Sequence, residues 1–384
     1  MTAPYDAIII GIGGMGSAAA AHLAGRGKRV LGLEQFSLAH DLGSSHGLTR
    51  IIRLAYFEHP SYVPLLRRSF ELWRDLERDT NTTLLHVTGG LDIGPEGGRI
   101  FEGSLRSCLE HALPHEVLSG SAVGDHFPAL VVPDGMRAVY QPDAGFLEPE
   151  RCVQAHVARA RSLGANIREY EPVIAWEPTE RGVQVITSHG TYEGAQLVMT
   201  AGPWAGALVP ELAQHLTPER QVLGWFEVTN HDIFAPAKLP VFWIESDVGA
   251  FYGFPEFAVP GLKLGRYHHL NERVVPDRID RETHRRDEAT LRACVERYFP
   301  LANGKLLSSK VCMFTNTVDE HFIVDRHPNH SQVLLVSPCS GHGFKFCSVI
   351  GEVVADLVDA DRTSHDISLF RLSRLGSLGG STLS

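Results

Sequence analysis

The chain has 384 residues, of which 43% are hydrophobic and 21% charged, and its formal net charge at pH 7 is -10. This composition is typical of a globular protein, and the negative charge argues against nucleic acid or an anionic membrane as a partner. No apolar run approaches the roughly twenty residues that span a bilayer, and the length favours two domains.

The first elements in the chain form a strand, a glycine turn and a helix. The apolar run Ala7–Ile10 is too short for a helix and rich in β-branched residues, which indicates a buried strand. Gly11 permits a tight turn, Gly13 lets the backbone approach a pyrophosphate, and Gly16 lets the following alanine-rich helix pack closely. The helix N-terminus then presents unpaired N–H groups to an anion.

A second apolar strand, Arg29–Leu33, ends in Glu34, whose carboxylate is placed to accept a hydrogen bond from a ribose hydroxyl. Strand, turn, helix, strand and acid follow in the order of a dinucleotide-binding unit, and this context favours a real site over a tight turn that binds nothing. The motif itself leaves NAD and FAD open.

A loop rich in Gly, Ser and His follows from Phe36 and ends in Arg50 and Arg53. Such a loop can lie over a cofactor and bring cations to its far end, although composition alone favours a polar surface loop with solvated arginines. Residues 61–79 then repeat apolar side chains at helical spacing, which predicts a core helix.

Residues 88–146 alternate short apolar segments with Gly and Pro, which indicates an excursion of strands and loops out of the first domain. A predicted helix at 148–163 brings the chain back and is followed by short strands at 165–168 and 172–176. A hairpin at 182–193 and a buried strand at 196–200 come next. This strand ends at the small-residue turn Ala201–Trp204, an arrangement that favours FAD over NAD.

Residues 221–267 contain four strand-like segments, which predict a second, antiparallel sheet as the substrate domain. Lys263 interrupts one of these strands, so it is either a surface lysine or a cation held in a pocket. A later strand at 333–336 leads through the turn 340–346 into a predicted helix at 348–357, with Lys345 at its N-terminal turn. We expect the tail 371–384 to be frayed.

The cysteines are scattered and show no Cys-x-x-Cys spacing, which indicates reduced thiols in a cytoplasmic protein. The twenty histidines form no His-Glu-x-x-His or Cys/His pattern, so no metal is expected. The groups His268-His269 and His327–His330 are interpreted as surface or loop residues. The six cysteines are Cys108, Cys152, Cys294, Cys312, Cys339 and Cys347.

Taken together, these stretches resemble the monomeric sarcosine oxidase family, a branch of the D-amino-acid-oxidase-like flavoproteins. The resemblance spans nearly the whole chain. It rests on the segments 11–16 with Glu34, 43–53, 252–255, 261–263, 312–315 with 319–322, and 340–346.

The resemblance implies an α/β fold with an FAD-binding, Rossmann-like domain of the two-dinucleotide type. A second α+β substrate domain is built on an antiparallel sheet. We predict that residues 1–87, 146–216 and 318–384 form the FAD-binding domain, and that residues 88–145 and 217–317 form the substrate domain. The family also implies a monomer.

The family further implies a flavin-dependent oxidase that converts sarcosine, or a related N-methyl amino acid, with oxygen and water into the amino acid, formaldehyde and hydrogen peroxide. Cys312 matches the residue that is joined to the flavin by a thioether in this family. Without the resemblance, Cys312 would be interpreted as a small buried hydrophobic residue. Arg53 and Lys345 match a pair that binds the substrate carboxylate, and Lys263 matches the lysine that promotes reaction with oxygen. We therefore expect residues 53, 263 and 345 to face a common cavity.

The remaining roles also come from the resemblance. The catalytic residues are expected to be Lys263, Arg50, His46, Tyr252 and His268. Substrate contacts are expected from Arg53, Lys345, Tyr252, Trp243 and Gly341. The expected FAD contacts are Gly11, Gly13, Gly14, Met15, Gly16, Glu34, Gln35, Ser44, His46, Thr49, Arg50, Val173, Gly202, Trp204, Cys312 (covalent), Gly341, Gly343, Phe344 and Lys345.

Three departures from the family leave the substrate open. Trp243 replaces a flexible methionine of the pocket wall, and Phe314 replaces a tyrosine. Strand alternation places Tyr267, rather than His268, where the family has a histidine, unless a bulge intervenes.

The alternatives are an oxidase of a cyclic or bulkier amine, such as proline, pipecolate or N-methyltryptophan, or an amine dehydrogenase that uses another acceptor. A further alternative is a dinucleotide sensor without enzymatic activity. That alternative assigns no role to Arg53, Lys263, Cys312 and Lys345.

Overall fold

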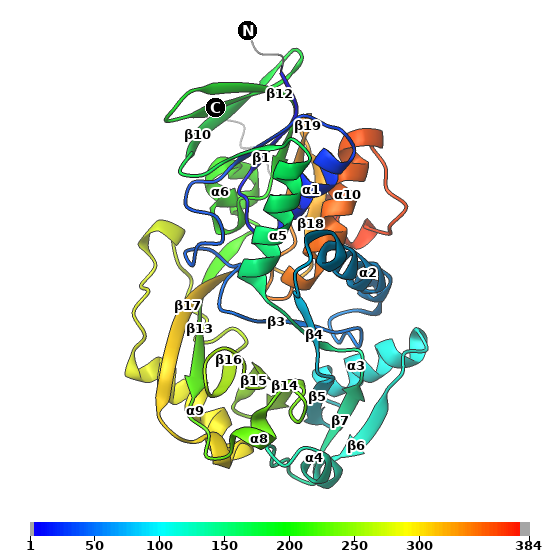
Figure 1. Ribbon diagram of the computed structural model, residues 1–384, viewed down its shortest axis with the longest axis vertical. Helices are drawn as coiled ribbons and strands as arrows, with labels where there is room; N and C mark the ends of the chain where they lie inside the picture. The colour runs from blue at the N-terminus through cyan, green and yellow to red at the C-terminus, as the bar shows by residue number, and fades with distance from the viewer. Residues whose placement is uncertain (1–3, 377–384) are drawn as a thin grey trace.

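The computed structural model describes residues 4–376. Its first sheet has eight strands and holds the glycine turn (Figure 1). The strands are β1 (Tyr5–Ile10), β2 (Val30–Leu33), β9 (Asn166–Arg168), β10 (Val173–Thr179), β11 (Gly182–Thr187), β12 (Thr191–Met199), β18 (Ile323–His327) and β19 (His330–Ser337).

The centre of this sheet is parallel. β1 runs parallel to β2 on one side and to β12 on the other, while β9 pairs in parallel with β2, and β19 with β12. β10, β11 and β18 add antiparallel pairs. The carboxyl ends of β1, β2, β12 and β19 therefore meet at one edge, which is where open α/β sheets bind their ligands.

Helices cover this sheet. α1 lies between α5 and α10 and contacts both, and α2 packs across α5 and α10 (Figure 1). The longer helices are α1 (Gly14–Gly25), α2 (Val63–Thr80), α5 (Pro149–Ser162) and α10 (Cys347–Ala360), and the short ones are α6 (Ala205–Leu208) and α7 (Pro210–Ala213). Single 3₁₀ turns span Pro60–Tyr62, Gly202–Trp204, Phe344–Phe346, Ser368–Phe370 and Leu372–Leu375.

Small side chains set how closely α1 and α10 approach. Ala18, Ala19 and Ala20 are fully buried, and a Cβ at Gly351 of α10 would lie only 2.7 Å from the carbonyl carbon of Ala18. The helices therefore meet almost backbone to backbone, which fixes the direction in which the N-terminus of α1 points.

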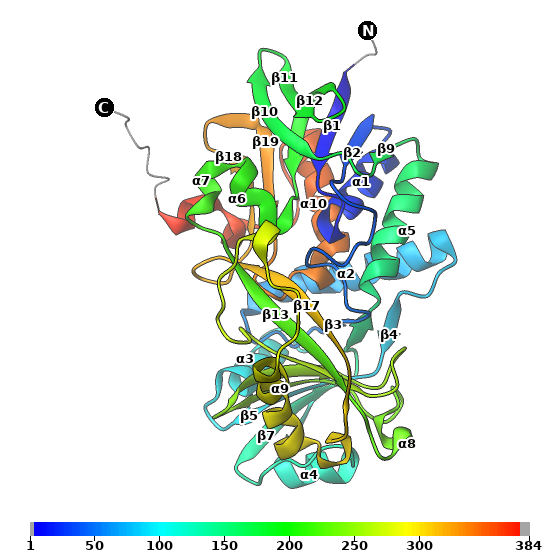
Figure 2. The ribbon, with the colours of Figure 1, turned by 90° about the vertical axis from the view of Figure 1, so that its left-hand side faces the viewer.

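The second sheet also has eight strands, in the order β17-β13-β16-β15-β14-β5-β7-β6, and Figure 2 shows the long pair β13 and β17 reaching down to it from the first domain. All its pairings are antiparallel except that of β14 with β5. The strands are β5 (Gly90–Pro95), β6 (Glu116–Ser119), β7 (Met136–Gln141), β13 (Thr217–Phe226), β14 (Val241–Ser246), β15 (Gly249–Phe254), β16 (Leu262–Arg266) and β17 (Leu306–Asn316).

Four helices accompany this sheet: α3 (Arg99–Glu110), α4 (Gly120–His126), α8 (His231–Phe234) and α9 (Arg285–Tyr298), with 3₁₀ turns at Pro276–Arg278 and Pro300–Ala302. A third sheet, β3 (Arg50–Ile52), β8 (Gly145–Leu147) and β4 (Leu85–Val87), carries the chain between the domains. The strands of the first and second sheets fall within the predicted FAD-binding and substrate ranges, respectively, whereas β8 crosses the predicted boundary at 145/146. The division remains a prediction.

Several local expectations were wrong. The excursion at 88–146 contains α3 and α4 as well as strands, and α9 was not anticipated. His269 is fully buried against Asp287 rather than on the surface, and His327 is buried at the end of β18.

The tail is held in place at least as far as Leu375. Leu372 is buried, and Arg371 and Arg374 form ion pairs with Asp325 and Asp319. These contacts contradict the expected fraying over residues 371–375, because they tie the segment to β18 and the loop before it. The rest of that expectation, residues 377–384, lies outside the described residues.

No helix within residues 4–376 combines the length and apolar character needed to cross a membrane.

Candidate active site

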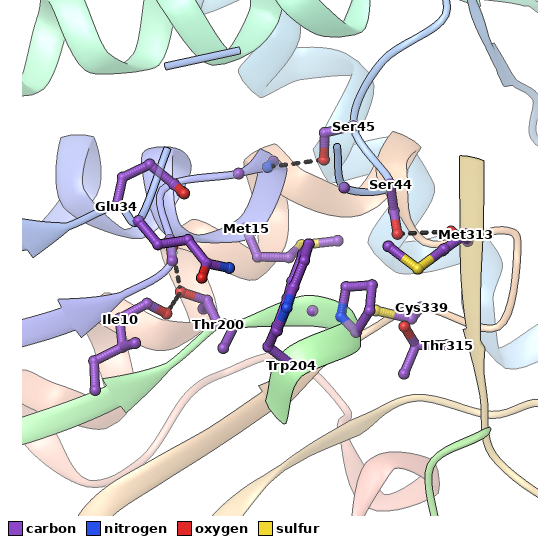
Figure 3. A pocket seen from close by; sticks show the side chains of 18 of the residues that line it. Ile10, Met15, Glu34, Ser44, Ser45, Thr200, Trp204, Met313, Thr315 and Cys339 are labelled. Carbon is purple, nitrogen blue, oxygen red and sulfur yellow. Dashed lines mark hydrogen bonds between the residues drawn. The ribbon is translucent and has the colours of Figure 1, made fainter. Parts of the chain in front are cut away.

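A cavity of about 400 Å³ opens at the carboxyl edge of the first sheet. Figure 3 shows Glu34 and Thr200 on one side of Trp204, and Thr315 and Cys339 on the other. The cavity is lined by segments that follow β1, β2 and β12, by the loop before β3, by residues 313–315 of β17, and by the turn between β19 and α10. It therefore runs from the glycine turn towards the second domain.

The glycine turn has the geometry of a phosphate site. Gly11 has φ +88°, and a Cβ there would lie 2.7 Å from the Thr200 carbonyl oxygen, while a Cβ at Gly16 would lie 1.9 Å from the Gly11 carbonyl oxygen. No side chain caps the N-terminus of α1. Two N–H groups of the turn are bonded by side chains: the Gly14 N–H donates to Ser45 Oγ over 3.1 Å, and the Ile12 N–H donates to Glu34. The other N–H groups at this helix end are available to an anion.

Glu34 is buried at the end of β2. Its Oε2 accepts a hydrogen bond from the Ile12 amide (2.8 Å) and its Oε1 from the Phe36 amide (3.1 Å). These bonds hold the carboxylate at the cavity wall, and its oxygens keep further lone pairs that can accept from a ribose hydroxyl.

The far end of the cavity is closed by the loop before β3, which bonds to β17. Ser44 Oγ donates to the Met313 carbonyl (2.6 Å), and Arg50 donates to the carbonyls of Ser44 and Thr49 (2.9 Å each). Thr315 Oγ1 is buried at the cavity wall without a hydrogen-bond partner in the described structure. A buried hydroxyl without a partner in this position suits a polar ligand atom.

Lys263 of β16 is buried beneath this loop. Its ammonium donates to the Gly47 carbonyl (2.6 Å), to Thr49 Oγ1 (2.7 Å) and to the Thr49 carbonyl (3.0 Å), and it lies 4.3 Å from the centre of the Phe254 ring. Burial, reinforced by the charge of Arg50, holds the pKa of Lys263 well below its usual value. None of the hydrogen-bond partners of this ammonium in the described residues is a carboxylate.

His46 and Cys312 lie near the same charges. His46 is buried, neither of its ring nitrogens has a hydrogen-bond partner in the part of the chain described, and burial together with Arg50 lowers its pKa to about 3. Its imidazole is therefore neutral. Cys312 is buried on β17, and burial raises the pKa of its thiol, while the nearby charges of Arg50 and Lys263 act in the opposite direction.

Arg53 and Lys345 lie together in a second group. Arg53 Cζ is 4.6 Å and Lys345 Nζ 5.3 Å from the centre of the Tyr56 ring, although they are far apart in the sequence. Arg53 Nη2 forms an ion pair with Glu58 at 2.8 Å. Lys345 Nζ donates to the His342 carbonyl (2.8 Å), and burial together with Arg53 lowers its pKa to about 7.

Aromatic side chains stand beside this pair of cations. The Trp243 ring lies 5.2 Å from Tyr252, 5.5 Å from Tyr267 and 5.9 Å from Arg53 Cζ, and Tyr267 lies 5.7 Å from Phe314. We call Trp243, Tyr252, Tyr267 and Phe314 the aromatic wall. A Cβ at Gly341 would lie 2.6 Å from the Phe314 ring, so only a glycine at this position leaves enough space for the Phe314 side chain.

Tyr267 and His268 lie in different surroundings. Tyr267 belongs to the aromatic wall and donates from its hydroxyl to the Ser340 carbonyl (2.9 Å). His268, with φ +54°, turns its ring between the carboxylates of Glu219 (3.1 Å) and Glu320 (2.8 Å). The two carboxylates raise the pKa of His268 to about 9 against the opposing effect of burial, and its predicted catalytic role stays a prediction.

This pair of contacts predicts a pH-dependent stability. The pKa of His268 is about 9 in the folded protein and 6.5 for a free histidine, so its contribution is fully present below pH 6.5 and is lost as the pH rises through 9. We expect His268→Gln to lower the melting temperature clearly at pH 6 and by little at pH 10. The control is the exposed His126→Gln. If the difference in melting temperature between His268→Gln and the wild type were the same at pH 6 and pH 10, the ion pairs of His268 would be contradicted.

Of the predicted FAD contacts, most line the cavity: Gly11, Gly13, Gly14, Met15, Glu34, Gln35, Ser44, Arg50, Val173, Gly202, Trp204, Gly341, Gly343 and Phe344. Gly16, His46, Thr49, Cys312 and Lys345 lie outside its lining. Arg53, Lys263 and Lys345 do not share it as expected: Arg53 and Lys345 form one group, and Lys263 lies under the loop before β3.

Sequence reasoning missed several lining residues. Thr200 directly follows β12 and bonds to the Ile10 and Gly11 carbonyls, so its position after a parallel strand was a usable signal. Asp277 gave no such signal, because it comes from the second domain and accepts a hydrogen bond from the Trp204 indole at 2.7 Å. Other lining residues that were not predicted include Ser45, His40, Met313, Thr315, Cys339 and Cys347.

The parallel sheet, the glycine turn and the buried acid at its edge define a dinucleotide-binding protein with a second, substrate-side domain. The family model "FAD dependent oxidoreductase" matches residues 6–357. The chain is 41% identical over 379 residues to "Monomeric sarcosine oxidase" of Bacillus sp. (strain NS-129), covering 97% of this chain and 98% of that one. It is 34% identical to "N-methyl-L-tryptophan oxidase" of Yersinia pestis (strain Pestoides F), covering 96% and 99%.

The chain therefore belongs to the FAD-dependent oxidoreductases and, among them, to the monomeric sarcosine oxidase family. Among solved structures, it is similar to NikD, "an unusual amino acid oxidase", with a TM-score of 0.82 at 24% identity, covering 96% of this chain and 98% of that one. That likeness confirms the predicted fold class.

Proposed function

We propose that this protein is a flavin-dependent oxidase of secondary amino acids, acting on sarcosine or a related N-methyl amino acid. The observation that carries the proposal is the pair of buried cations, Arg53 and Lys345, beside the aromatic wall and near the dinucleotide cavity. Glu58 pairs with Arg53, whereas Lys345 has no ion-pair partner in the described residues, and a buried cation without such a partner is costly unless a further anion joins it. A substrate carboxylate is such an anion.

The residues present fit FAD. The open N-terminus of α1 suits a pyrophosphate, Glu34 suits a ribose, and the unpartnered Thr315 hydroxyl suits a polar atom at the far end of the cavity. Bound FAD would supply the redox chemistry, as the acceptor of two electrons and a proton from the amine, and water would hydrolyse the imine that the amine becomes.

Arg53 and Lys345 bind and orient the substrate in this proposal. A guanidinium fork matches the two oxygens of a carboxylate, and a second cation completes the contact. The Lys345 backbone is anchored because its carbonyl accepts hydrogen bonds from Ser69 and from the Trp73 indole. A carboxylate beside Lys345 favours the charged form of a group whose pKa burial has lowered to about 7.

The aromatic wall limits the amine. Tyr252 lies across Gly265 in the sheet, and a Cβ at Gly265 would lie 2.6 Å from its hydroxyl, so this ring is held flat over β16. Trp243 packs against it and against Phe57 at 5.1 Å. Flat aromatic faces suit an N-methyl group or a ring, and cyclic or bulkier amines such as proline, pipecolate or N-methyltryptophan are the second candidates.

The experiment is a panel of sarcosine, N-methyl amino acids, proline and pipecolate, assayed for hydrogen peroxide with the purified holoenzyme. We expect peroxide from at least one secondary amino acid and none from the same amine without a carboxylate. Substrate-dependent reduction of an artificial acceptor without peroxide would indicate a dehydrogenase instead. No turnover with any amine would contradict the proposal.

Arg53→Lys tests the carboxylate contact directly. Lysine keeps the charge and loses the fork, so we expect KM for the best amine to rise about tenfold or more while kcat changes less. Arg78→Lys, in an exposed pair with Asp75, is the matched control and should leave both unchanged. Equal KM values for the Arg53→Lys and wild-type proteins would show that the arginine does not bind the carboxylate.

Three finer points belong to the same proposal. FAD is attached through Cys312, oxygen is the electron acceptor, and the enzyme works as a cytoplasmic monomer without a nucleic-acid or membrane partner. The net charge of -10 and the absence of disulfides within residues 4–376 support the last point. The same residues hold no group of three or more His, Cys, Asp and Glu side chains placed to bind a metal.

A further inference from the structure

A second, much smaller cavity lies directly behind Arg53. Its volume is about 10 Å³, and Arg53, Asp92, Gln141 and Trp243 are among the residues that line it. This is close to the least space that holds one water molecule. Most of the lining is apolar, but Arg53, Asp92 and Gln141 bring charged and polar side chains to it, which distinguishes the cavity from an ordinary packing gap.

Strand register brings the polar side chains to this cavity. Asp92 of β5 pairs with Trp243 of β14 on one side and with Val139 of β7 on the other. Gln141 lies two residues after Val139, so its side chain lies on the same face of the sheet as Asp92. Trp243 joins this face to the aromatic wall.

The hydrogen bonds around the cavity are incomplete. Arg53 Nε and Gln141 Nε2 are buried donors without a partner in the described structure. Asp92 is buried and accepts one hydrogen bond from a side chain, from Ser104 Oγ to Oδ2 at 2.7 Å. Gln141 Oε1 is already used by the amides of Leu54 (2.8 Å) and Ala55 (3.0 Å). Two donors and an acceptor thus surround a space the size of a water.

We propose that this cavity holds one buried water that accepts hydrogen bonds from Arg53 Nε and Gln141 Nε2 and donates one to Asp92. Asp92 is thereby a positioning residue for Arg53. The role in substrate binding rests on the proposed function, whereas the water site does not. The water satisfies three groups whose isolation would be costly, and a water with three bonds is the usual buried case.

The water would complete the support of the guanidinium. Arg53 Nη2 is held by Glu58 and Nη1 by the Ala55 carbonyl, and Nε is the nitrogen without a partner in the described structure. With one partner at each nitrogen, the plane of the guanidinium is fixed before a carboxylate arrives, and Nη1 keeps a second N–H for that carboxylate. Less ordering is then needed on binding, which raises affinity.

Charge gives Asp92 a second, measurable effect. The ionisable groups around Asp92 are Arg53, Glu58, Lys345 and, on α3, Cys108. Burial raises the pKa of Asp92 to about 6, so its charge is lost as the pH falls below that value. Because an ionised Asp92 repels a ligand carboxylate, affinity for that ligand should improve as the pH falls through 6.

Asp92→Leu and Asp92→Asn separate the two effects. Leucine has a similar shape but accepts no hydrogen bond and excludes water, whereas asparagine keeps an acceptor oxygen and removes the charge. The probe is acetate, which has no amine to oxidise, titrated into the holoenzyme and followed by the visible absorption of the bound flavin. Melting temperatures report whether each variant is folded.

We expect Asp92→Leu to raise Kd for acetate about tenfold, and Asp92→Asn to stay within about threefold of the wild type. We also expect Asp92→Asn to lose the step near pH 6, while a step near pH 7 from Lys345 remains. Wild-type affinity in Asp92→Leu, or equal weakening in both variants, would overturn the positioning role.

A crystal structure tests the water itself. We expect density for one water between Asp92, Arg53 and Gln141 in the wild type and none in Asp92→Leu. An empty cavity at a resolution that shows other buried waters would overturn the inference. A wild type that contains the water but binds no acetate would instead count against the proposed function.

Discussion

Replacing Cys312 with serine is expected to abolish the retention of yellow colour by the denatured, precipitated protein. A thioether needs a sulfur nucleophile, and a serine hydroxyl is far less nucleophilic than a thiolate. Cys312 lies on β17, next to the cavity residues Met313 and Phe314. The charges of Arg50 and Lys263 favour its thiolate against the burial that raises its pKa.

Two other cysteines make this test sharp. Cys339 and Cys347 line the cavity directly, whereas Cys312 lies just outside its lining. Cys339→Ser and Cys347→Ser are therefore matched controls, and both should keep the colour on the polypeptide. Colour that persists in Cys312→Ser, or disappears in either control, would assign the tether to another residue or to none.

Lys263→Met is expected to slow the reaction of the reduced enzyme with oxygen by about 100-fold or more, with little effect on reduction by the amine. Methionine has a similar length but no charge. A buried ammonium without a carboxylate partner in the described residues is costly, and its charge would stabilise the negative charge that develops on oxygen. Stopped-flow mixing separates the two half-reactions.

The contacts of Lys263 call for a second variant. Its ammonium also holds the loop at Gly47 and Thr49, so Lys263→Met removes these loop contacts together with the charge. Lys263→Arg keeps the charge, and we expect it to recover much of the rate with oxygen. Unchanged reaction with oxygen in Lys263→Met would refute the role, and equal slowing in both variants would assign the effect to the loop.

The elements differ in how far the local sequence determines them. The turn at Gly11 and the strand before it were predictable because local sterics dictate them. The helix α3 was missed because Gly103 interrupts it. A Cβ there would lie 2.6 Å from the Phe57 carbonyl oxygen, so the glycine is required by packing rather than by a turn. The stability of a helix such as α3 comes from packing against the surface that it covers, and the local sequence does not show that packing.

The sequence by itself determined the dinucleotide unit, the helices with a clear apolar stripe, and the family, because these depend on neighbouring residues and motif spacing. Only the tertiary structure decided that Arg53 is paired with Glu58 and joined by Lys345, and that Tyr267 rather than His268 belongs to the aromatic wall. It alone placed Asp92 behind Arg53. The physical reason is that strand register and domain packing set the contacts between distant segments, and these contacts cannot be deduced from the pattern of neighbouring residues.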